Sequence, residues 1–227
     1  MSWWNWLLHT DAGLAARVGV GVAIFALLAI SDLRSNGPAA RRWREYLFLL
    51  TCVAVGLLYG IVNDQITVGI SWEYFYYGKS LDEVLGATTP PADLPLRWQA
   101  AKVGMRATWS AGLILGVILL FANNPKANRP ALPFARLYQM LPLLLLIPAT
   151  CAALFGLLGY LGHLTWINSE FALLIKDNFW RPRRFMAVYG IHLGGYIGGL
   201  LGAILAAMRI RHQRREASNA VLQGRSL

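Results

Sequence analysis

The chain has 227 residues, of which 56% are hydrophobic and only 14% charged, and its formal net charge is +10. A soluble domain usually carries about 25% charged residues, so this composition disfavours a soluble protein and favours several membrane spans joined by short loops. Nucleic-acid binding would need a polar domain with a basic face, which the sequence does not offer. The positive charge instead lies beside apolar runs, as juxtamembrane charge does.

Five segments are apolar and long enough, at about 20 residues, to cross a bilayer as helices. They are residues 14–33, 46–62, 103–122, 137–161 and 185–208. We therefore expect an all-α membrane protein with about five transmembrane helices in one bundle. Residues 1–215 would form this single domain, and residues 216–227 would form a polar cytoplasmic tail.

The charges of the loops predict how the chain is oriented. Basic residues gather in three segments that alternate to one side: Arg34, Arg41, Arg42, Arg44, Lys126, Arg129, Arg136, Arg209, Arg211, Arg214, Arg215 and Arg225. Acidic residues gather on the other: Asp64, Glu73, Asp82, Glu83, Asp93, Glu170 and Asp177. Because positive loops mark the cytoplasm, we expect the N-terminus outside and the C-terminus in the cytoplasm, although Arg181, Arg183 and Arg184 break the pattern.

Apolar and polar residues alternate after the second span, from Ile66 to Tyr74. A period of two predicts an extended segment with one polar face, which would present Thr67 and Glu73. Such a segment must pair with another or lie against the helix ends, because a lone strand in hydrocarbon leaves its backbone groups unsatisfied. The alternative is an amphipathic segment on the surface. Either way, we expect a short extended or amphipathic external segment after the second helix.

Polar residues near the predicted outer face form a candidate site. Charged side chains at this depth are a functional hypothesis by default. Arg106 would need a carboxylate such as Asp64 or Glu73, or it would reach a lipid phosphate. His192 and Tyr196 share one face of the last span, at a depth similar to that of Asp64. The candidate residues are Asp64, Gln65, Thr67, Glu73, Tyr74, Arg106, His192 and Tyr196.

Two carboxylates and an imidazole, from Asp64, Glu73 and His192, suit a divalent metal or a proton relay, with His163 as a further member. Their spacing matches no defined metal motif, so the metal and any cofactor stay unknown. The sequence contains no CxxCH haem motif, Walker motif, Rossmann glycine fingerprint or nucleophile elbow. It therefore gives no support for haem or nucleotide chemistry.

Two parts of the chain resemble each other. Residues 56–58 and 156–158 both read Gly-Leu-Leu, and residues 112–119 are similar to residues 198–205. Spans two and three would then form a helical hairpin that is repeated as spans four and five, as in many transporters. The alternative is chance, because Gly and Leu coincide easily in membrane helices.

The run Tyr59-Gly60-Ile61-Val62-Asn63-Asp64-Gln65-Ile66-Thr67, followed by Glu73-Tyr74-Phe75, resembles an uncharacterised family of bacterial multi-pass membrane proteins with a DQ[IV][TS]…EYF signature. The start of the third span at Ala107 and the His-to-Gly-Gly run at residues 192–199 are similar to that family too. Many of its members have His where this chain has Asn63, and some have His where it has Lys79. The resemblance implies a bacterial inner-membrane protein, but it implies no established activity.

Three classes of function fit these features. The first is transport of an ion, proton or small solute past a polar site near the outer face. The second is a membrane-embedded enzyme that acts on a lipid or lipid-linked substrate, with acid–base or metal chemistry near the headgroups. The third is a non-catalytic subunit of a membrane assembly. The expected partners are the lipid bilayer and a second copy or another membrane protein, and not nucleic acid.

Overall fold

The structure is a computed structural model that describes residues 3, 10–86, 88, 90–125, 129–164 and 181–222. Within them the chain is helical, with no β-strand, and five helices are long and apolar enough to cross a membrane. This confirms the expected multi-pass helical membrane protein. The long helices are α2 (Asp11–Asn36), α3 (Arg42–Ile70), α6 (Asp93–Ala122), α8 (Leu141–Tyr160) and α10 (Pro182–Leu222). The short ones are η1 (Gly37–Ala39), α4 (Trp72–Tyr76), α5 (Asp82–Leu85) and α7 (Phe134–Tyr138).

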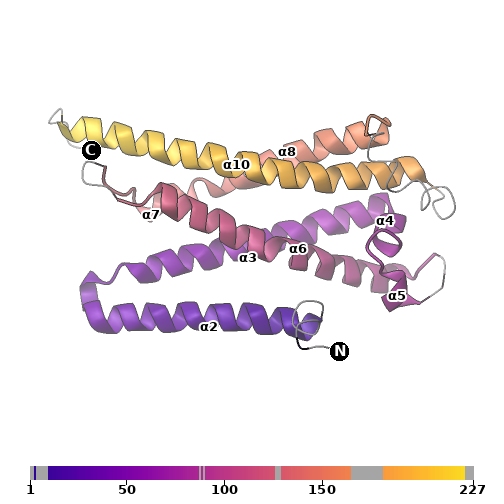
Figure 1. Ribbon diagram of the computed structural model, residues 1–227, viewed down its shortest axis with the longest axis horizontal. Coiled ribbons are helices and arrows are strands. Elements are labelled where there is room, and N and C mark those ends of the chain that lie inside the picture. Colours follow the sequence, from indigo (N-terminus) through magenta and orange to yellow (C-terminus); the bar gives the residue numbers. More distant parts are fainter. Residues whose placement is uncertain are drawn as a thin grey trace.

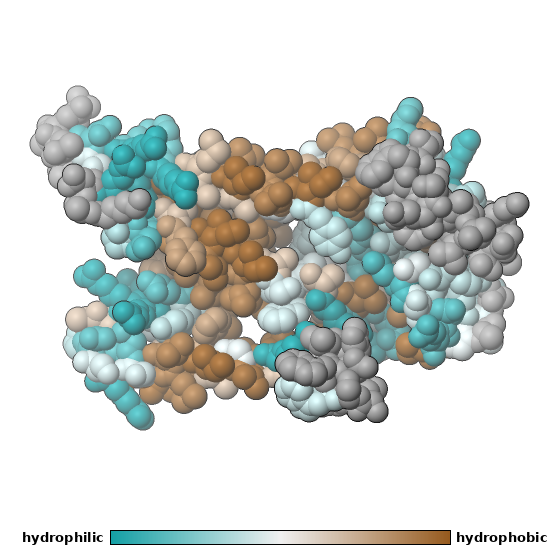
Figure 2. Space-filling model, viewed as in Figure 1, coloured by the Kyte–Doolittle hydropathy of each residue, from teal (hydrophilic) through white to brown (hydrophobic). Residues whose placement is uncertain are grey.

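The long helices lie along one axis, and α2 begins at the end of the bundle where α4 and α5 lie (Figure 1). Helix α10 finishes at the opposite end, beyond α7. Apolar side chains gather over the middle of the molecule and hydrophilic ones gather near both ends (Figure 2). This distribution suits a bundle whose middle lies in hydrocarbon. Helix α10 continues past Arg215 to Leu222, so the first residues of the expected polar tail are helical. Lys126, Glu170, Asp177 and Arg225 lie outside the described residues.

Asp32 fixes the connection between α2 and α3. Its buried carboxylate accepts the backbone N–H of Arg42 at 2.9 Å and the side-chain amide of Asn36 at 2.8 Å. The first bond satisfies an N–H at the start of α3 that has no partner within its own helix. Gly37 ends α2 with a φ of 51°, a backbone conformation that favours glycine. The turn therefore depends on a carboxylate within the last turn of the first span and on the glycine that follows α2.

Glycines bring the helices together in two tight hairpins, α3 with α6 and α8 with α10. A Cβ on Gly56 would lie 2.8 Å from the carbonyl oxygen of Thr108, and one on Gly104 would collide with the backbone of Gly60. Small residues allow this close approach between membrane helices. The glycines matched in the sequence do not make matched contacts, however, because Gly56 faces Gly112 whereas Gly156 faces Ile191.

The expected extended segment after the second helix is wrong, because α3 continues to Ile70 and α4 follows directly. The hydroxyl of Thr67 donates to the carbonyl of Asn63 at 2.9 Å, a contact made within the turn of a helix. Ile66 is 60% exposed while Val68 is buried, so the alternating apolar residues do not share a face. A helix is more stable here than an extended strand because it satisfies every backbone group within one segment.

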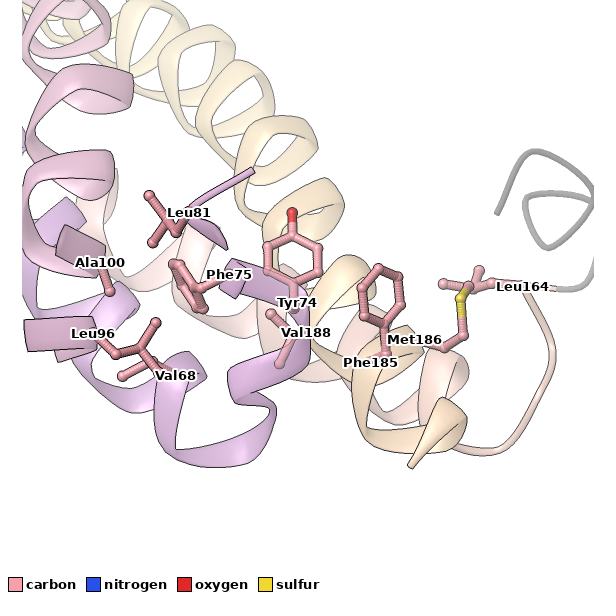
Figure 3. Packing of buried hydrophobic residues seen from close by; sticks show 10 residues of the cluster. All are labelled: Val68, Tyr74, Phe75, Leu81, Leu96, Ala100, Leu164, Phe185, Met186 and Val188. Atoms are coloured by element: carbon pink, nitrogen blue, oxygen red, sulfur yellow. The ribbon is translucent and has the colours of Figure 1, made fainter. Parts of the chain in front are cut away.

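Ser71 ends α3 and starts α4. Its backbone N–H donates to the carbonyl of Thr67, and its hydroxyl accepts the N–H of Tyr74 as an N-cap. Four of the five residues of α4 are buried, so α4 is not an amphipathic segment on the surface either. Tyr74 and Phe75 of α4 lie between α6 and the start of α10, where Phe185 packs against Tyr74 (Figure 3). Burying one large apolar side chain contributes about 1.5–3 kcal/mol, so this cluster holds α4 in place.

Candidate functional site

A cavity of about 320 Å³ lies between α3, α6, α8 and α10. It extends from Asp64 to Cys52 on α3, which is about 18 Å along a helix at a rise of 1.5 Å per residue. Glycine creates part of this space, because a Cβ on Gly199 would meet no heavy atom within 4 Å. The end near Asp64 is polar, whereas Leu115 and Leu144 belong to the apolar remainder of the wall.

The polar end contains a buried carboxylate and an imidazole. Asp64 of α3 is only 2% exposed, and its Oδ1 lies 3.7 Å from Nε2 of His192 on α10. The amide of Asn63 donates to the same oxygen at 3.1 Å. The distance to His192 exceeds the usual hydrogen-bond range of about 2.7–3.2 Å. Within the described part of the chain, Nε2 of His192 has no hydrogen-bond partner. Both groups line the cavity, so both are available to a molecule inside it.

Helix α4 holds the imidazole in place from behind. The ring of Tyr74 stacks on that of His192, with centroids 4.9 Å apart and an interplanar angle of 10°. The ring of Phe75 meets the same imidazole edge-on at 6.0 Å. Burial raises the pKa of the Tyr74 hydroxyl, so Tyr74 stays a neutral phenol. Neither aromatic residue lines the cavity, so both position His192 without facing the space beside it.

Lys79 brings a positive charge to the same end of the cavity. It follows α4, and its Nζ lies 5.4 Å from the centroid of the Tyr74 ring, in a cation–π contact. Partial burial lowers the pKa of Lys79, and the negative charge of Asp64 opposes this shift. The turn that carries Lys79 needs Gly78, because a Cβ there would lie 2.6 Å from the carbonyl oxygen of Tyr74.

Two tyrosines complete the polar end. Tyr59 of α3 and Tyr196 of α10 both line the cavity, and Tyr196 is 60% exposed. Tyr59 was not among the candidates from the sequence, and neither was Asn63. Tyr59 and Asn63 are four residues apart and therefore share a helix face. Asn63 directly precedes Asp64, so the face that Tyr59 shares with Asn63 was the signal that could have found both residues.

The structure places five of the eight candidates outside the cavity. Besides Tyr74 and Arg106, these are three polar residues at or just after the end of α3. The side-chain amide of Gln65 donates to the carbonyl of Arg97 on α6 at 2.9 Å. Thr67 is buried and bonds within its own helix. Glu73 is also buried and accepts the hydroxyl of Ser71 at 2.8 Å. These polar groups therefore hold helices in place and do not face the cavity.

Arg106 has a carboxylate partner, but the partner is Asp11 at the start of α2 and not Asp64 or Glu73. Lys102 reaches the other oxygen of the same carboxylate at 2.7 Å. One turn and a half further along α2, Arg17 lies 5.7 Å from the ring centroid of Trp109. Arg106 thus belongs to the contact between α2 and α6. The N-terminal turn of α2 favours a negative side chain such as that of Asp11. That Asp11 lies beside α6, however, follows from how α2 packs against α6.

The set of Asp64, Glu73, His192 and His163 is not assembled around one point. His163 is exposed and does not line the cavity. Among the described residues, no group of three or more His, Cys, Asp or Glu side chains is placed to hold a metal ion. Asp64 and His192 remain as a pair.

Comparison of the chain with protein-family models, with curated proteins and with solved structures found no match. The geometry of the cavity alone therefore bears on function. It is an elongated apolar space between membrane helices, and one of its ends carries a buried carboxylate beside an imidazole.

Proposed function

We propose that this protein binds an amphipathic molecule, a lipid or lipid-linked compound, in the cavity between α3, α6, α8 and α10. The polar head of that molecule would meet Asp64, Lys79 and His192, and its apolar part would lie between the helices. The observation that carries the proposal is the change in character along one continuous cavity, from charged at Asp64 to apolar at Leu144. Sites for small molecules combine apolar walls with a few placed polar groups in this way.

The head-binding end offers complementary chemistry. The Asp64 carboxylate accepts hydrogen bonds, His192 can donate or accept, and Lys79 is cationic when protonated. A head with a hydroxyl or carbonyl group would find a partner for each of its polar atoms. A carboxylate and an imidazole within one ligand's reach can also exchange protons with it. An enzyme that acts on the head of a lipid-linked substrate is therefore the activity that we favour.

Transport of a proton is the second candidate, because a buried carboxylate lies 3.7 Å from an imidazole within the bundle. The apolar remainder of the cavity counts against a path for a hydrated ion, since an ion there would lose its hydration without replacement. Transport of an ion or small solute, and a purely structural role, stay predictions from the sequence.

We also propose that the Asp64 end of the cavity faces the outside of a bacterial inner membrane. The described part of the chain places Arg34, Arg42, Arg136 and Arg211 at the other end of the bundle, where α10 finishes. Positive residues mark the cytoplasmic side. Arg183 and Arg184, at the start of α10, oppose this orientation. Reporter fusions at Asp82, the first residue of α5, and after Leu222 test this orientation, and a cytoplasmic Asp82 would reverse it.

A pair of glycine variants tests the proposed ligand. Gly199 lines the cavity and Gly21 of α2 does not, and a Cβ at either position would meet no heavy atom within 4 Å. Purified wild-type protein, Gly199→Leu and Gly21→Leu would each be extracted with organic solvent, and the bound molecules quantified by mass spectrometry. We expect one amphipathic compound to fall several-fold in Gly199→Leu only.

Equal amounts of every lipid in the three proteins would contradict the proposal, because lipids around the bundle do not depend on the cavity. Measuring proton flux in proteoliposomes distinguishes the second candidate, proton transport, from the first, an enzyme. Flux that is lost in Asp64→Asn but kept in Gly199→Leu would favour transport over an enzyme with a lipid-linked substrate.

A further inference from the structure

A second, smaller cavity lies at the opposite end of the bundle from Asp64. Its volume is about 110 Å³, and it is lined by Phe121, Ala122, Arg129, Arg211 and Arg214. Three of its five lining residues are arginines, which come from the connection between α6 and α7 and from α10. It shares no residue with the larger cavity. Its function is therefore separate from the proposed function.

Arg214 forms the fixed base of this cavity. It is only 4% exposed, and its guanidinium donates to the carbonyls of Ala122 at 2.8 Å, Arg129 at 2.7 Å and Pro130 at 3.0 Å. The carbonyls at a helix C-terminus lack partners within the helix and carry partial negative charge. These bonds use three of the five N–H groups of arginine. They hold one positive charge rigidly at the end of α6.

Arg129 and Arg211 add two more positive charges, and both residues are exposed. In the described part of the chain, neither makes an ion pair with a carboxylate. Glu216 is also on α10, but its Oε2 lies 3.4 Å from Nδ1 of His212, one turn before it. Like charges around one small space repel each other. An anion in the cavity would attract all three arginines and so offset the repulsion among them.

The position of the cavity indicates which anion fits. Ala122 is the last residue of α6, and Phe121 beside it is 74% exposed. An exposed apolar ring suits contact with hydrocarbon, and the arginines beside it suit contact with headgroups. Together they suit the boundary between the two. Basic pockets between membrane helices on the cytoplasmic side bind anionic lipid headgroups, and it is the orientation proposed above that puts this end of the bundle on that side.

We propose that Arg129, Arg211 and Arg214 bind the phosphate of an anionic phospholipid, whose acyl chain runs along Phe121. Arginine suits this ligand because its planar fork matches phosphate oxygens in two-point contacts. The lipid would join the C-terminal part of α6 to α10, in addition to the bonds made by Arg214.

Two double variants test this site. Arg129→Gln/Arg211→Gln removes two charges from the cavity and leaves Arg214 in place. Arg136→Gln/Arg209→Gln removes two exposed charges from α7 and α10 that do not line it. Full-length proteins in neutral detergent would be titrated with phosphatidylglycerol and, separately, phosphatidylcholine, and binding counted by native mass spectrometry. We expect tight phosphatidylglycerol binding to weaken about tenfold or more in the first variant and to be nearly unchanged in the second.

Equal weakening in the two double variants would overturn the site, since it would mean attraction by the whole basic end. Equal binding of phosphatidylcholine would overturn the preference for an anionic lipid. Inorganic phosphate provides the remaining arm: if it displaces phosphatidylglycerol at equal concentration, the ligand is a soluble phosphate and not a lipid. Arg211→Gln alone serves as a milder variant if the double variant does not fold, and it should still weaken binding severalfold.

Discussion

The carboxylate of Asp64 and the imidazole of His192 lie 3.7 Å apart at one end of a cavity that is otherwise largely apolar. They come from α3 and α10, which belong to different helical hairpins. Each hairpin is close-packed through its own glycines, so the space between them is where a molecule can enter. A ligand that binds both Asp64 and His192 would therefore contact both hairpins at the same time.

Asp64→Asn should weaken ligand binding without unfolding the protein. The substitution keeps the shape of the side chain and removes a buried charge, which itself costs free energy to bury. A lost hydrogen bond to a charged group lowers affinity by about tenfold to a hundredfold. Binding of the compound identified with Gly199→Leu measures the change, and thermal unfolding measures stability.

Asp11→Asn is the matched control, because Asp11 pairs with Arg106 and Lys102 outside the cavity. We expect it to lower stability by about 0–1 kcal/mol, as partly exposed ion pairs do, and to leave ligand binding unchanged. Equal binding by Asp64→Asn and the wild type would show that Asp64 does not touch the ligand.

Tyr74→Leu should disturb His192 more than Tyr74→Phe does. Phenylalanine keeps the ring that stacks on the imidazole at 4.9 Å, whereas leucine removes it from a position that is only 5% exposed. Loss of the aromatic contact and of buried volume should cost about 1–3 kcal/mol. Thermal unfolding and ligand affinity of the two variants check this. If both variants bind the ligand equally well, the stacking does not position His192.

The membrane spans could be predicted from the sequence because length and apolar character suffice for them. The observed helices extend beyond the apolar runs, as α3 does from Arg42 to Ile70, since a helix need not stop where hydrocarbon ends. Because α3 continues in this way, the prediction of an extended segment after it was wrong. Alternating β-branched residues such as Ile66 and Val68 favour a strand by local pattern, but the backbone of α3 was already helical and its hydrogen bonds continued to Ser71.

The site was predictable only in part. Depth along the spans predicted that Asp64 and His192 lie at one level, and the structure places them 3.7 Å apart. The partner of Arg106 could not be predicted, because it depends on where α2 lies against α6. Lys79 enters the cavity only through the turn after α4. Both features arise from packing between distant segments, which periodicity along one chain does not encode.

Gly104→Ala should destabilise the α3–α6 hairpin. A Cβ at this position would collide with the backbone of Gly60 and lie 3.1 Å from Oδ2 of Asp64. Backbone atoms cannot move aside cheaply, so the cost should be at least about 1–3 kcal/mol. Gly19→Ala on α2 is the control, since its Cβ would meet no heavy atom within 4 Å. Alanine also favours a helix over glycine, so the control should unfold at the same temperature or higher. Thermal unfolding of both variants decides, and equal melting temperatures would contradict the close packing.

Lys79→Met should change how stability depends on pH. The pKa of Lys79 is lowered from 10.5 by partial burial, against the opposing charge of Asp64. Between the lowered folded value and 10.5, the unfolded chain therefore binds more protons than the folded protein. Stability contributed by this group must rise with pH across that window. Below the window, both states are protonated and the cost of burying the charge stays constant. The wild type should thus gain stability relative to Lys79→Met as the pH is raised toward 10.5, and melting temperatures of the two proteins across this window measure the gain. Parallel curves over the whole range would show that Lys79 is equally solvated in both states and does not enter the cavity.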